Sequence, residues 1–376
     1  MQPIFFDILL ATALLSAVIV LLIEVPRLFA VIKKSNSDNA ASQNIDYESL
    51  PGITVVVYTH NSVSGLERLI PQLMSQDYPR DRYEVVVVND GANPATESLL
   101  LLLEAHWPQL LRHTFTPADT RGMSSKNLAL MLGIKSARFP VVLHTTSDVS
   151  IESDKWAACM AAPFAKKQDT QIVIGGVVLE SGKKLRRRIH LMETAGFLAS
   201  AIRHKSWRGD GANLAYTRQL FFDNKGFSPI LNLKHGGGDD DAYISEVSNS
   251  VNTEVCIARE SIVALQPDDH VIYWRNAMRR RRWALKQCKP GARRIQAFTS
   301  ALLWLSLLTS LSAMAFAVET PLKIIAPLCV QLVLWTSLSV FWRKIAVVLG
   351  AKPCLFSVPW ILLLRPLRTI YNLRFV

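Results

Sequence analysis

Cysteine is scarce in this chain, and acidic residues are outnumbered by basic ones. The five cysteines have no spacing typical of a disulfide framework or a metal site, so we expect them to be reduced packing residues. They are Cys159, Cys256, Cys288, Cys329 and Cys354. The chain has 30 Asp and Glu against 42 Lys and Arg, which gives a formal net charge of +12. Nucleic acid, an anionic membrane face or a phosphorylated substrate would each suit this positive charge.

The chain also lacks internal repeats, low-complexity tracts and basic motifs interleaved with aromatic residues. The last absence argues against a nucleic-acid-binding protein. The basic residues gather instead in stretches that mostly flank apolar segments, at 27–34, 183–188, 275–294 and 343–374. Cations at the borders of apolar segments are typical of membrane proteins, so we expect a membrane, and no nucleic acid, among the partners.

Half of the residues are hydrophobic, and the run from Ile4 to Ile23 is long enough to cross a bilayer core, which takes roughly 20 residues. No positive segment precedes this run and no clear small-residue cleavage site follows it, so an uncleaved anchor is favoured over a signal peptide. Arg27, Lys33 and Lys34 place the following chain in the cytoplasm by the positive-inside rule. Residues 35–49 are rich in Asn, Ser and Asp and are predicted to be a linker.

Two further apolar segments, 297–318 and 322–342, lie towards the other end of the chain. Only a short Glu-Thr-Pro turn separates them, so they are predicted to form a helical hairpin through the bilayer. A third segment, 354–364, is too short to span and contains Pro359. It is predicted to be interfacial or re-entrant.

Between the first anchor and the hairpin, the sequence alternates strands and helices. Residues 53–61 and 83–90 are predicted buried strands with a helix at 66–74 between them, which is the βαβ organisation of a parallel sheet. A helix near 99–104 and an edge strand near 113–115 follow. Both buried strands end in polar turns, so we expect these turns to face one crevice.

A loop that contains Gly122 and Ser124 then opens another predicted helix, which carries four aliphatic residues. These are Leu128, Leu130, Leu132 and Ile134. Arg121 and Lys126 lie beside the start of this helix. The amino end of a helix flanked by cations favours an anion.

The stretch from Pro140 to Trp156 is the central one for the predicted site, because a buried strand ends there in a polar turn. Residues 139–143 form a predicted strand, and Thr145 to Asp148 are turn formers with oxygen side chains. Ligands bind at the carboxyl ends of strands in open α/β sheets, and oxygen side chains suit a hard divalent cation with its phosphates. An ordinary strand end with a solvated Asp is the alternative interpretation.

The order and spacing of seven motifs resemble a family-2 glycosyltransferase domain of the GT-A fold, from Ile53 to Asp241. In chain order the motifs are YTHN, SQDYP, VVNDGA, KNLALMLGIKSA, HTTSDVSIESDKW, GDGANLAYTRQLFF and GGGDDDAYI. Each motif alone is a weak signal, but the set in this order is specific. The resemblance implies a Rossmann-like mixed sheet, so the predicted fold class is an α/β GT-A domain flanked by transmembrane helices.

The resemblance implies donor-binding roles for five residues. Asp90 would hold the base of a nucleoside-diphosphate sugar. Asp148 would bind Mg²⁺ or Mn²⁺ on the diphosphate. Thr59, Asn61 and Lys126 would be further donor contacts.

Three consecutive carboxylates follow the glycines at 236–238 in the last motif. The resemblance implies that Asp240 is the general base, which takes the proton from an acceptor hydroxyl, and that Asp239 positions the acceptor. Asp241 is assigned to the acceptor or the diphosphate, unless it only solvates the loop. An acidic loop that stays in solvent is the alternative for all three.

The sequence departs from the family pattern at three positions. Thr146 replaces the first carboxylate of the usual Asp-x-Asp turn, and Ser62 replaces the acidic residue that usually follows the Asn of the first strand. Metal binding is therefore expected to be weaker than with a two-carboxylate turn. In the segment RRRRW, Arg279 takes the place of the Gln in the Gln-x-x-Arg-Trp motif of many membrane-attached relatives. Arg282 and Trp283 would hold the diphosphate and stack on sugar, or this basic helix lies on anionic lipid.

Together these features predict a membrane-bound, hexosyltransferase-like enzyme that moves a sugar from a nucleotide-sugar donor to a lipid-linked or polysaccharide acceptor, with inversion. A catalytically inactive relative that acts as a scaffold in envelope-polysaccharide assembly is the alternative, because of Thr146. The expected location is a bacterial-type inner membrane, multi-pass, with the catalytic domain in the cytoplasm. The predicted boundaries are 1–28 anchor, 29–50 linker, 51–270 glycosyltransferase domain, 271–295 basic juxtamembrane segment, 296–344 hairpin and 345–376 interfacial segment.

Overall fold

The computed structural model describes residues 2–91, 93–117, 125–227, 239–288, 291–317, 321–353 and 356–368. The chain divides into two compact units. The larger unit comprises residues 33–289 and 349–351, and the smaller unit comprises residues 1–32, 290–348 and 352–376. Each unit has its own hydrophobic core.

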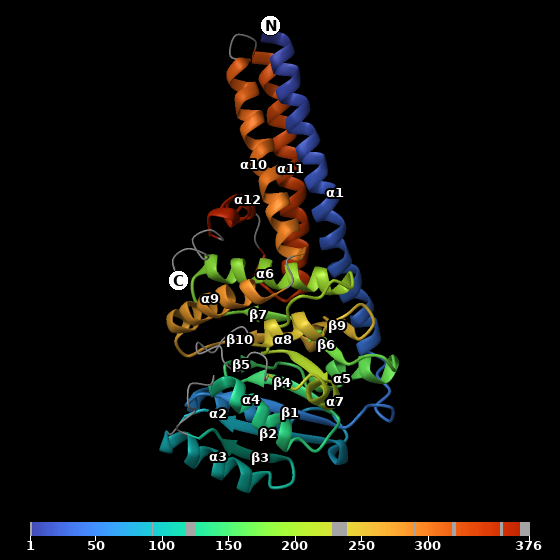
Figure 1. The fold of residues 1–376 in the computed structure, drawn as a ribbon, viewed down its shortest axis with the longest axis vertical. Coiled ribbons are helices and arrows are strands. Elements are labelled where there is room, and N and C mark those ends of the chain that lie inside the picture. The colour runs from blue at the N-terminus through green and yellow to red at the C-terminus, as the bar shows by residue number, and fades with distance from the viewer. Residues whose placement is uncertain are drawn as a thin grey trace. The chain divides into compact units, whose positions relative to one another are not determined.

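The larger unit is built on a mixed seven-stranded sheet with the strand order β3-β2-β1-β4-β8-β6-β9 (Figure 1). The strands are β1 (Ile53–Thr59), β2 (Tyr83–Asn89), β3 (Leu111–Phe115), β4 (Val141–Thr146), β6 (Ile172–Gly175), β8 (Leu214–Thr217) and β9 (Thr253–Cys256). Strands β1 to β4 are parallel, as predicted for the βαβ region, and β3 lies at the sheet edge. Strand β8 runs antiparallel to both β4 and β6, so its first residue, Leu214, pairs with His144 near the end of β4.

The central strands are buried because helices cover both faces of the sheet. Val55 and Val57 of β1 belong to one core cluster with Leu66 of α2 (Val63–Met74). Val56 points to the opposite face, where it meets α4 (Ser125–Ser136) at Gly133. A Cβ at Gly133 would lie 2.5 Å from Val56 Cγ1, so glycine allows α4 to approach the sheet closely. Coverage on both faces explains why these parallel strands are almost wholly apolar.

A second sheet of three strands lies in the same unit, in the order β5-β10-β7. Its strands are β5 (Val149–Ser150), β10 (Val263–Leu265) and β7 (Val177–Leu179). Strand β10 pairs antiparallel with β5 and parallel with β7, so it is the middle strand. This pairing brings the segment after β10 next to the turn that precedes β5.

The remaining helices of the larger unit complete the layers around the two sheets. They are α3 (Pro94–His106), α5 (Trp156–Lys166), α6 (Lys184–Ile202), α7 (Arg218–Asp223), α8 (Asp239–Val247) and α9 (His270–Gln287). The carboxylates at 239–241 were expected in a loop, but they begin α8. A helix start is a favourable place for them because the helix dipole stabilises negative charge there.

The smaller unit contains α10 (Gly291–Phe316), α11 (Pro321–Val348) and α12 (Val358–Leu363), with the first part of α1 (Gln2–Ser42). Within the described part of the chain, three helices are long and apolar enough to cross a membrane: Ile4–Ser42, Arg294–Phe316 and Leu322–Val348. Polar side chains join them, since Ser306 donates to the carbonyl of Ala13 at 3.1 Å and Gln331 donates to the carbonyl of Ser306 at 3.0 Å. Such bonds are typical of packed membrane helices.

The predicted linker is wrong over residues 35–42, where α1 continues as a helix to Ser42. The Asn, Ser and Asp side chains of this stretch are poor helix formers, but they have tertiary partners. Asp38 accepts a hydrogen bond from the backbone of Ile257 at 2.9 Å, and Asn39 accepts one from the backbone of Arg259 at 2.7 Å. These two bonds fix the last turns of α1 to the segment 257–259, and both partners of each bond belong to the larger unit.

The four cysteines that the structure describes are free, but only three of them are buried packing residues as expected. Cys159, Cys256 and Cys288 are free and buried, and Cys329 is free and exposed. Burial raises the pKa of the Cys256 thiol to about 11, with a smaller contribution from the charge of Asp38. Cys354 lies outside the described residues.

Candidate functional site

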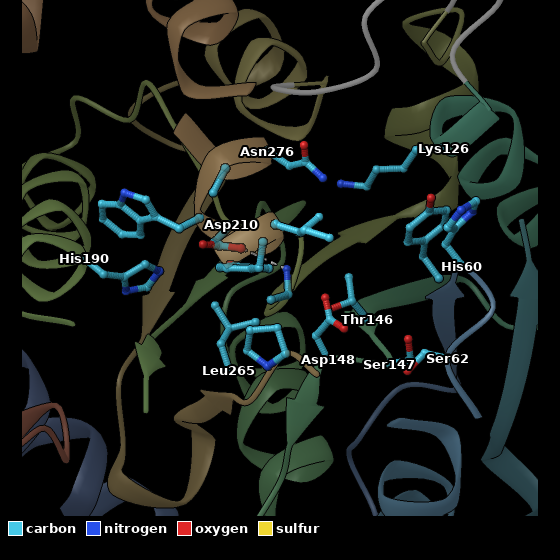
Figure 2. Close-up of a pocket in the computed structure, with 18 of the residues that line it drawn as sticks. His60, Ser62, Lys126, Thr146, Ser147, Asp148, His190, Asp210, Leu265 and Asn276 are labelled. Carbon is cyan, nitrogen blue, oxygen red and sulfur yellow. Dashed lines mark hydrogen bonds between the residues drawn. The ribbon is translucent and has the colours of Figure 1, made fainter. Parts of the chain in front are cut away.

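A cavity of about 420 Å³ lies at the carboxyl ends of β1 and β4 in the larger unit. Figure 2 shows Asp148 near Thr146, with His190 and Asp210 on one side and His60 and Ser62 on the other. Helices α6 and α9 supply further residues of the wall. Its size falls in the range of small-molecule sites, which is roughly 300–1,000 Å³.

The direction of β8 explains why distant residues meet here. Because β8 starts beside the end of β4, the segment just before β8 lies at the same sheet edge as the turns after β1 and β4. This segment, residues 209–212, lines the cavity. Asp210 is fixed there by a hydrogen bond from the backbone of Ala212 to its Oδ1 at 3.1 Å.

The turn with Asp148 connects β4 to β5. Thr145 and Thr146 were expected in this turn, but they form the end of β4, and the turn itself is Ser147 and Asp148. The backbone N–H of Ser147 donates to the carbonyl of Tyr58 at 3.0 Å, and the carbonyl of Asp148 accepts from the backbone N–H of Gln266 at 2.7 Å. These bonds from both sides fix the turn, with Asp148 at the cavity wall.

The turn offers oxygen ligands of the type that Mg²⁺ and Mn²⁺ prefer. Thr146, Ser147 and Asp148 contribute two hydroxyls and one carboxylate to the cavity lining. Among the described residues, no three His, Cys, Asp or Glu side chains gather where they would hold a metal ion. The donor chemistry therefore fits a divalent cation, but most of its ligands would have to be water and the bound nucleotide.

Asp90 is buried, with an exposed fraction of only 6%. Its carboxylate accepts hydrogen bonds from the hydroxyls of Tyr58 at 2.8 Å, Thr116 at 2.9 Å and Ser125 at 2.8 Å, and His60 Nδ1 lies 3.7 Å away. Burial alone would raise the pKa of Asp90, but hydrogen bonds from His60 and the three hydroxyls lower it to about 2. The hydrogen bond with Asp90 raises the pKa of His60, against the opposing effect of burial.

Asp90 lies in the wall of a second cavity of about 500 Å³, which Asn89, Phe115 and Ser125 also line. Tyr58 and His60 line the first cavity, so their bonds to Asp90 connect the two. The predicted donor residues are thus distributed between two neighbouring cavities.

The other predicted donor contacts differ in what they present to the cavities. Asn61 lines the first cavity in the left-handed region with a φ of 53°, and its Oδ1 accepts from the backbone of Asn93 at 3.2 Å. Lys126, in the first turn of α4, lines the same cavity with its Nζ 5.9 Å from the centre of the Tyr58 ring. Thr59 is fully buried and is absent from the described lining of either cavity, so a donor contact by its side chain is not supported.

Asp241 is the member of the acidic triplet whose side chain is described. It is 7% exposed, lines the first cavity and accepts a hydrogen bond from Arg208 Nε at 2.9 Å. The alternative that Asp241 only solvates a loop is therefore wrong, because its charge is paired inside the protein.

Several other predicted residues fall outside the described part of the chain. Asp239 and Asp240 begin α8, but their side chains are not described. Arg282 and Trp283 belong to α9, and their side chains are likewise not described. The loop with Arg121, Gly122 and Ser124 and the glycines at 236–238 also lie outside the described residues.

Sequence analysis missed Asp268, which lines the first cavity. Its Oδ2 accepts hydrogen bonds from the hydroxyls of Ser62 at 3.1 Å and Ser64 at 2.7 Å. The neighbouring Asp269 accepts from the backbone of Ile272 at 2.9 Å and thereby caps α9. Two Asp residues after an apolar strand and a Pro, in the segment LQPDDH, resemble the turn signal used for Asp148 and would have found this loop.

Sequence analysis also missed two residues of α6, His190 and Glu193, which line the cavity. Figure 2 shows His190 across the cavity from Asp148. The two residues lie three positions apart and so share one face of the helix. No local motif marks them, because only the packing of α6 against β7 and β9 brings them to the cavity.

Residues 54–227 match the family model described as "Glycosyl transferase family 2". A 60-residue stretch is 35% identical to a protein named β-monoglucosyldiacylglycerol synthase from Synechocystis sp.. This stretch is 16% of the present chain and 12% of that relative, so the chain spans only a small part of its length.

Among solved structures, the mannosyltransferase PcManGT from Pyrobaculum calidifontis, in complex with GDP-Man and Mn²⁺, aligns with a TM-score of 0.55 at 18% identity. The alignment covers 90% of this chain and 99% of that one. S. aureus TarS 1-349 in complex with UDP-GlcNAc aligns with a TM-score of 0.43 at 17% identity, over 86% and 89% of the two chains. The likeness to the mannosyltransferase confirms the predicted GT-A fold class.

Proposed function

Residues 54–227 belong to glycosyltransferase family 2, and from this premise we propose that the protein transfers a sugar from a nucleoside-diphosphate sugar to an acceptor hydroxyl. By family the enzyme class is that of the glycosyltransferases, EC 2.4. The donor, the acceptor and the stereochemistry belong to the proposal. The same holds for the glycosyltransferase domain at 51–270, which extends beyond the matched residues.

One observation carries the proposal: Asp148, Asn61 and Lys126 line the same cavity at the carboxyl ends of the strands. An oxygen-rich turn and an ammonium group in one cavity suit a diphosphate, since its charge needs cations on more than one side. A mannosyltransferase of the same fold, solved with GDP-Man and Mn²⁺, supports a nucleotide sugar and a divalent metal as ligands.

The proposed reaction requires a leaving group, a base and a cation. The acceptor oxygen attacks the anomeric carbon while the bond to the diphosphate breaks, which inverts the configuration at that carbon. Asp240 accepts the proton of the attacking hydroxyl. Lys126 and Asp148 bind the diphosphate end of the donor, Lys126 directly and Asp148 as a ligand of the metal. A bound divalent cation stabilises negative charge on the leaving diphosphate.

The acceptor is proposed to be lipid-linked or a growing glycan. The three candidate membrane-spanning helices support attachment to a membrane. The positive-inside rule supports a multi-pass arrangement in a bacterial-type inner membrane, with the catalytic domain in the cytoplasm. Nucleotide sugars would be available to the cavity on that side.

A catalytically inactive scaffold in envelope-polysaccharide assembly is the second candidate function. The observation that favours it is the single carboxylate in the turn, where Thr146 stands in place of the usual Asp. A scaffold would keep the fold and the cavity but would not turn over a donor.

The deciding experiment uses the full-length protein, purified in nanodiscs, with a panel of nucleotide sugars. Release of nucleoside diphosphate, with and without a mixed lipid extract as acceptor, measures hydrolysis and transfer. Turnover of any donor supports the enzyme. If no donor binds or turns over, while melting curves show a folded protein, the scaffold is the better description.

A further inference from the structure

The starts of α6 and α9 form one continuous surface of the larger unit. Arg186 of α6 donates to the carbonyl of His270 at 3.5 Å, and its guanidinium carbon lies 5.8 Å from the centre of the Trp274 ring. Gly182, just before α6, contacts the imidazole of His270 so closely that a Cβ there would lie 3.2 Å from a ring carbon. These contacts hold the two helix starts together, and α6 and α9 are seen next to each other in Figure 1.

Basic side chains dominate this surface. Its cations are Lys183, Lys184, Arg186, Arg187 and Arg188 around the start of α6 and Arg275 on α9. In the described part of the chain, none of them forms an ion pair with an Asp or Glu side chain. Arg187 donates instead to the backbone carbonyl of Glu180 at 3.1 Å. These cations therefore form no ion pair within the described chain, although Arg275 interacts electrostatically with Asp269.

Three large aliphatic side chains at these two helix starts are exposed. Leu185 is 56% exposed, Val271 is 52% exposed and Ile272 is 47% exposed. Leu185 lies between Lys184 and Arg186, so an exposed apolar side chain stands among the cations of this segment. This combination is typical of protein surfaces that lie at the boundary between lipid headgroups and acyl chains.

We propose that this basic surface binds the headgroups of an anionic membrane, with Leu185, Val271 and Ile272 inserted among them. Charge complementarity selects the partner, because each cation near an anionic leaflet adds to its attraction. The three candidate membrane-spanning helices in the same chain mean that a bilayer is present wherever this protein is inserted. The exposed aliphatic groups distinguish a membrane from a soluble polyanion, which would leave them in water.

The surface is continuous with the rim of the cavity. Ile272 and Trp274 belong to the start of α9 and also line the first cavity. A membrane held at this surface would therefore present its headgroups at the cavity entrance. Membrane binding by this surface does not depend on catalysis, so its test stands apart from the test of the proposed function.

The experiment measures contact between this surface and lipid in the full-length protein. Leu185→Cys is introduced together with Cys329→Ser and Cys354→Ser, labelled with a bimane dye, and reconstituted in nanodiscs whose lipids carry bromine on the acyl chains. Leu102→Cys in α3 is the matched position, since Leu102 is 68% exposed. With phosphatidylglycerol in the discs, quenching at position 185 should be at least about twofold stronger than at position 102.

Charge is tested with two triple variants of equal size. Lys183→Gln, Lys184→Gln and Arg188→Gln together should reduce the quenching to the level seen with phosphatidylcholine alone. Arg80→Gln, Lys135→Gln and Lys166→Gln remove three exposed cations elsewhere and should leave the quenching unchanged. A second test of charge uses no substitution of basic residues: added salt should weaken the quenching at position 185 in the protein that keeps all its cations. Equal quenching at positions 185 and 102, or full quenching in the first triple variant, would overturn the proposal.

Discussion

The carboxylate of Asp268 lies 2.7 Å from the hydroxyl of Ser64, although 204 positions separate the two residues in sequence. Ser62 donates to the same oxygen at 3.1 Å, so the loop after β10 is fixed to the first turn of α2. The other carboxylate oxygen accepts no hydrogen bond from the described residues. Asp268 thus presents a carboxylate beside Ser62, the position at which the sequence lacks the acidic residue expected there.

Replacement of Asp268 tests whether this carboxylate contacts the donor. Asp268→Ala should weaken the affinity for a nucleotide sugar by about tenfold, because a hydrogen bond to a charged group is lost. Ser64→Ala is the control, since it removes one partner but keeps the carboxylate. The double variant Ser62→Asp with Asp268→Ser should regain most of the affinity. Calorimetry that gives the same dissociation constant for Asp268→Ala and the natural protein would assign Asp268 to loop packing alone.

The pair of His60 and Asp90 predicts a pH dependence. The pKa of His60 is raised above its ordinary 6.5, so the stabilisation from the protonated pair is fully present below pH 6.5 and is lost as pH rises through the raised pKa. Asp90→Asn should bring the titration midpoint of His60, measured by NMR, back towards 6.5. As the pH rises from 6.5 through the raised pKa of His60, the melting temperature of the natural protein should fall, and that of Asp90→Asn should change less. A His60 midpoint that does not respond to Asp90→Asn would contradict this coupling.

Metal dependence is predicted from the single carboxylate of the Asp148 turn. Donor binding should require Mg²⁺ or Mn²⁺ and should weaken in Asp148→Ala, since one carboxylate and the diphosphate oxygens complete the site. Thr146→Asp should tighten metal binding by adding a second carboxylate at the end of β4. Calorimetry with UDP and GDP, in metal and in chelator, measures both effects. Equal affinity in chelator would leave the turn a structural role only.

Asp240→Asn separates chemistry from binding. The amide keeps the size of the carboxylate but removes the base, so turnover should fall by roughly two to four powers of ten while donor affinity barely changes. Asp239→Asn should have a smaller effect. Asp241→Asn should instead lower the melting temperature, because Asp241 is buried against Arg208 and loss of such a charge pair costs about 3 kcal/mol. Transfer rates for the three variants decide the assignment, and full activity of Asp240→Asn would exclude it as the base.

The topology prediction places the N-terminus outside, residues 27–296 inside and the chain after Trp342 inside again. It rests on Arg27, Arg294 and Arg343, which flank the predicted apolar segments at the ends assigned to the inside, against Lys323 near the opposite turn. Reporter fusions at Gly226 and after Trp342 measure the orientation. A periplasmic signal at Gly226 would refute both the topology and the use of cytoplasmic nucleotide sugars.

The family and the fold could be predicted because motif order and strand patterning are local in sequence. The alternation of apolar strands and polar turns located β1, β2 and the Asp148 turn, and residues 54–227 match the family-2 model. Local patterning did not reveal the second cavity or the enclosure of Asp90. Its partners Thr116 and Ser125 lie 26 and 35 positions away, and no short motif encodes them.

Glu84 shows the same limit inside the sheet. It lies in β2, whose sequence suggested an apolar strand, yet its carboxylate is fully buried and accepts bonds from Thr54 at 2.6 Å and Arg112 at 2.8 Å. Arg138 adds a further bond at 2.6 Å. Burial opposes ionisation of Glu84, but these partners lower its pKa. A buried charge is tolerated only with such partners, and they become neighbours only when the chain has folded.

The middle position of β10 has a consequence for the synthesis of this protein. Strands β5 and β7 end at Ser150 and Leu179, but neither has a partner in its sheet until β10, at 263–265, has left the ribosome. Helix α9, which supplies a wall of the cavity, follows directly after β10. Domains generally fold from the N-terminal side during translation, and unpaired strand edges are prone to wrong pairing. A ribosome that stalls before residue 263 would therefore hold a nascent chain with the parallel strands complete and the donor cavity still open on one side.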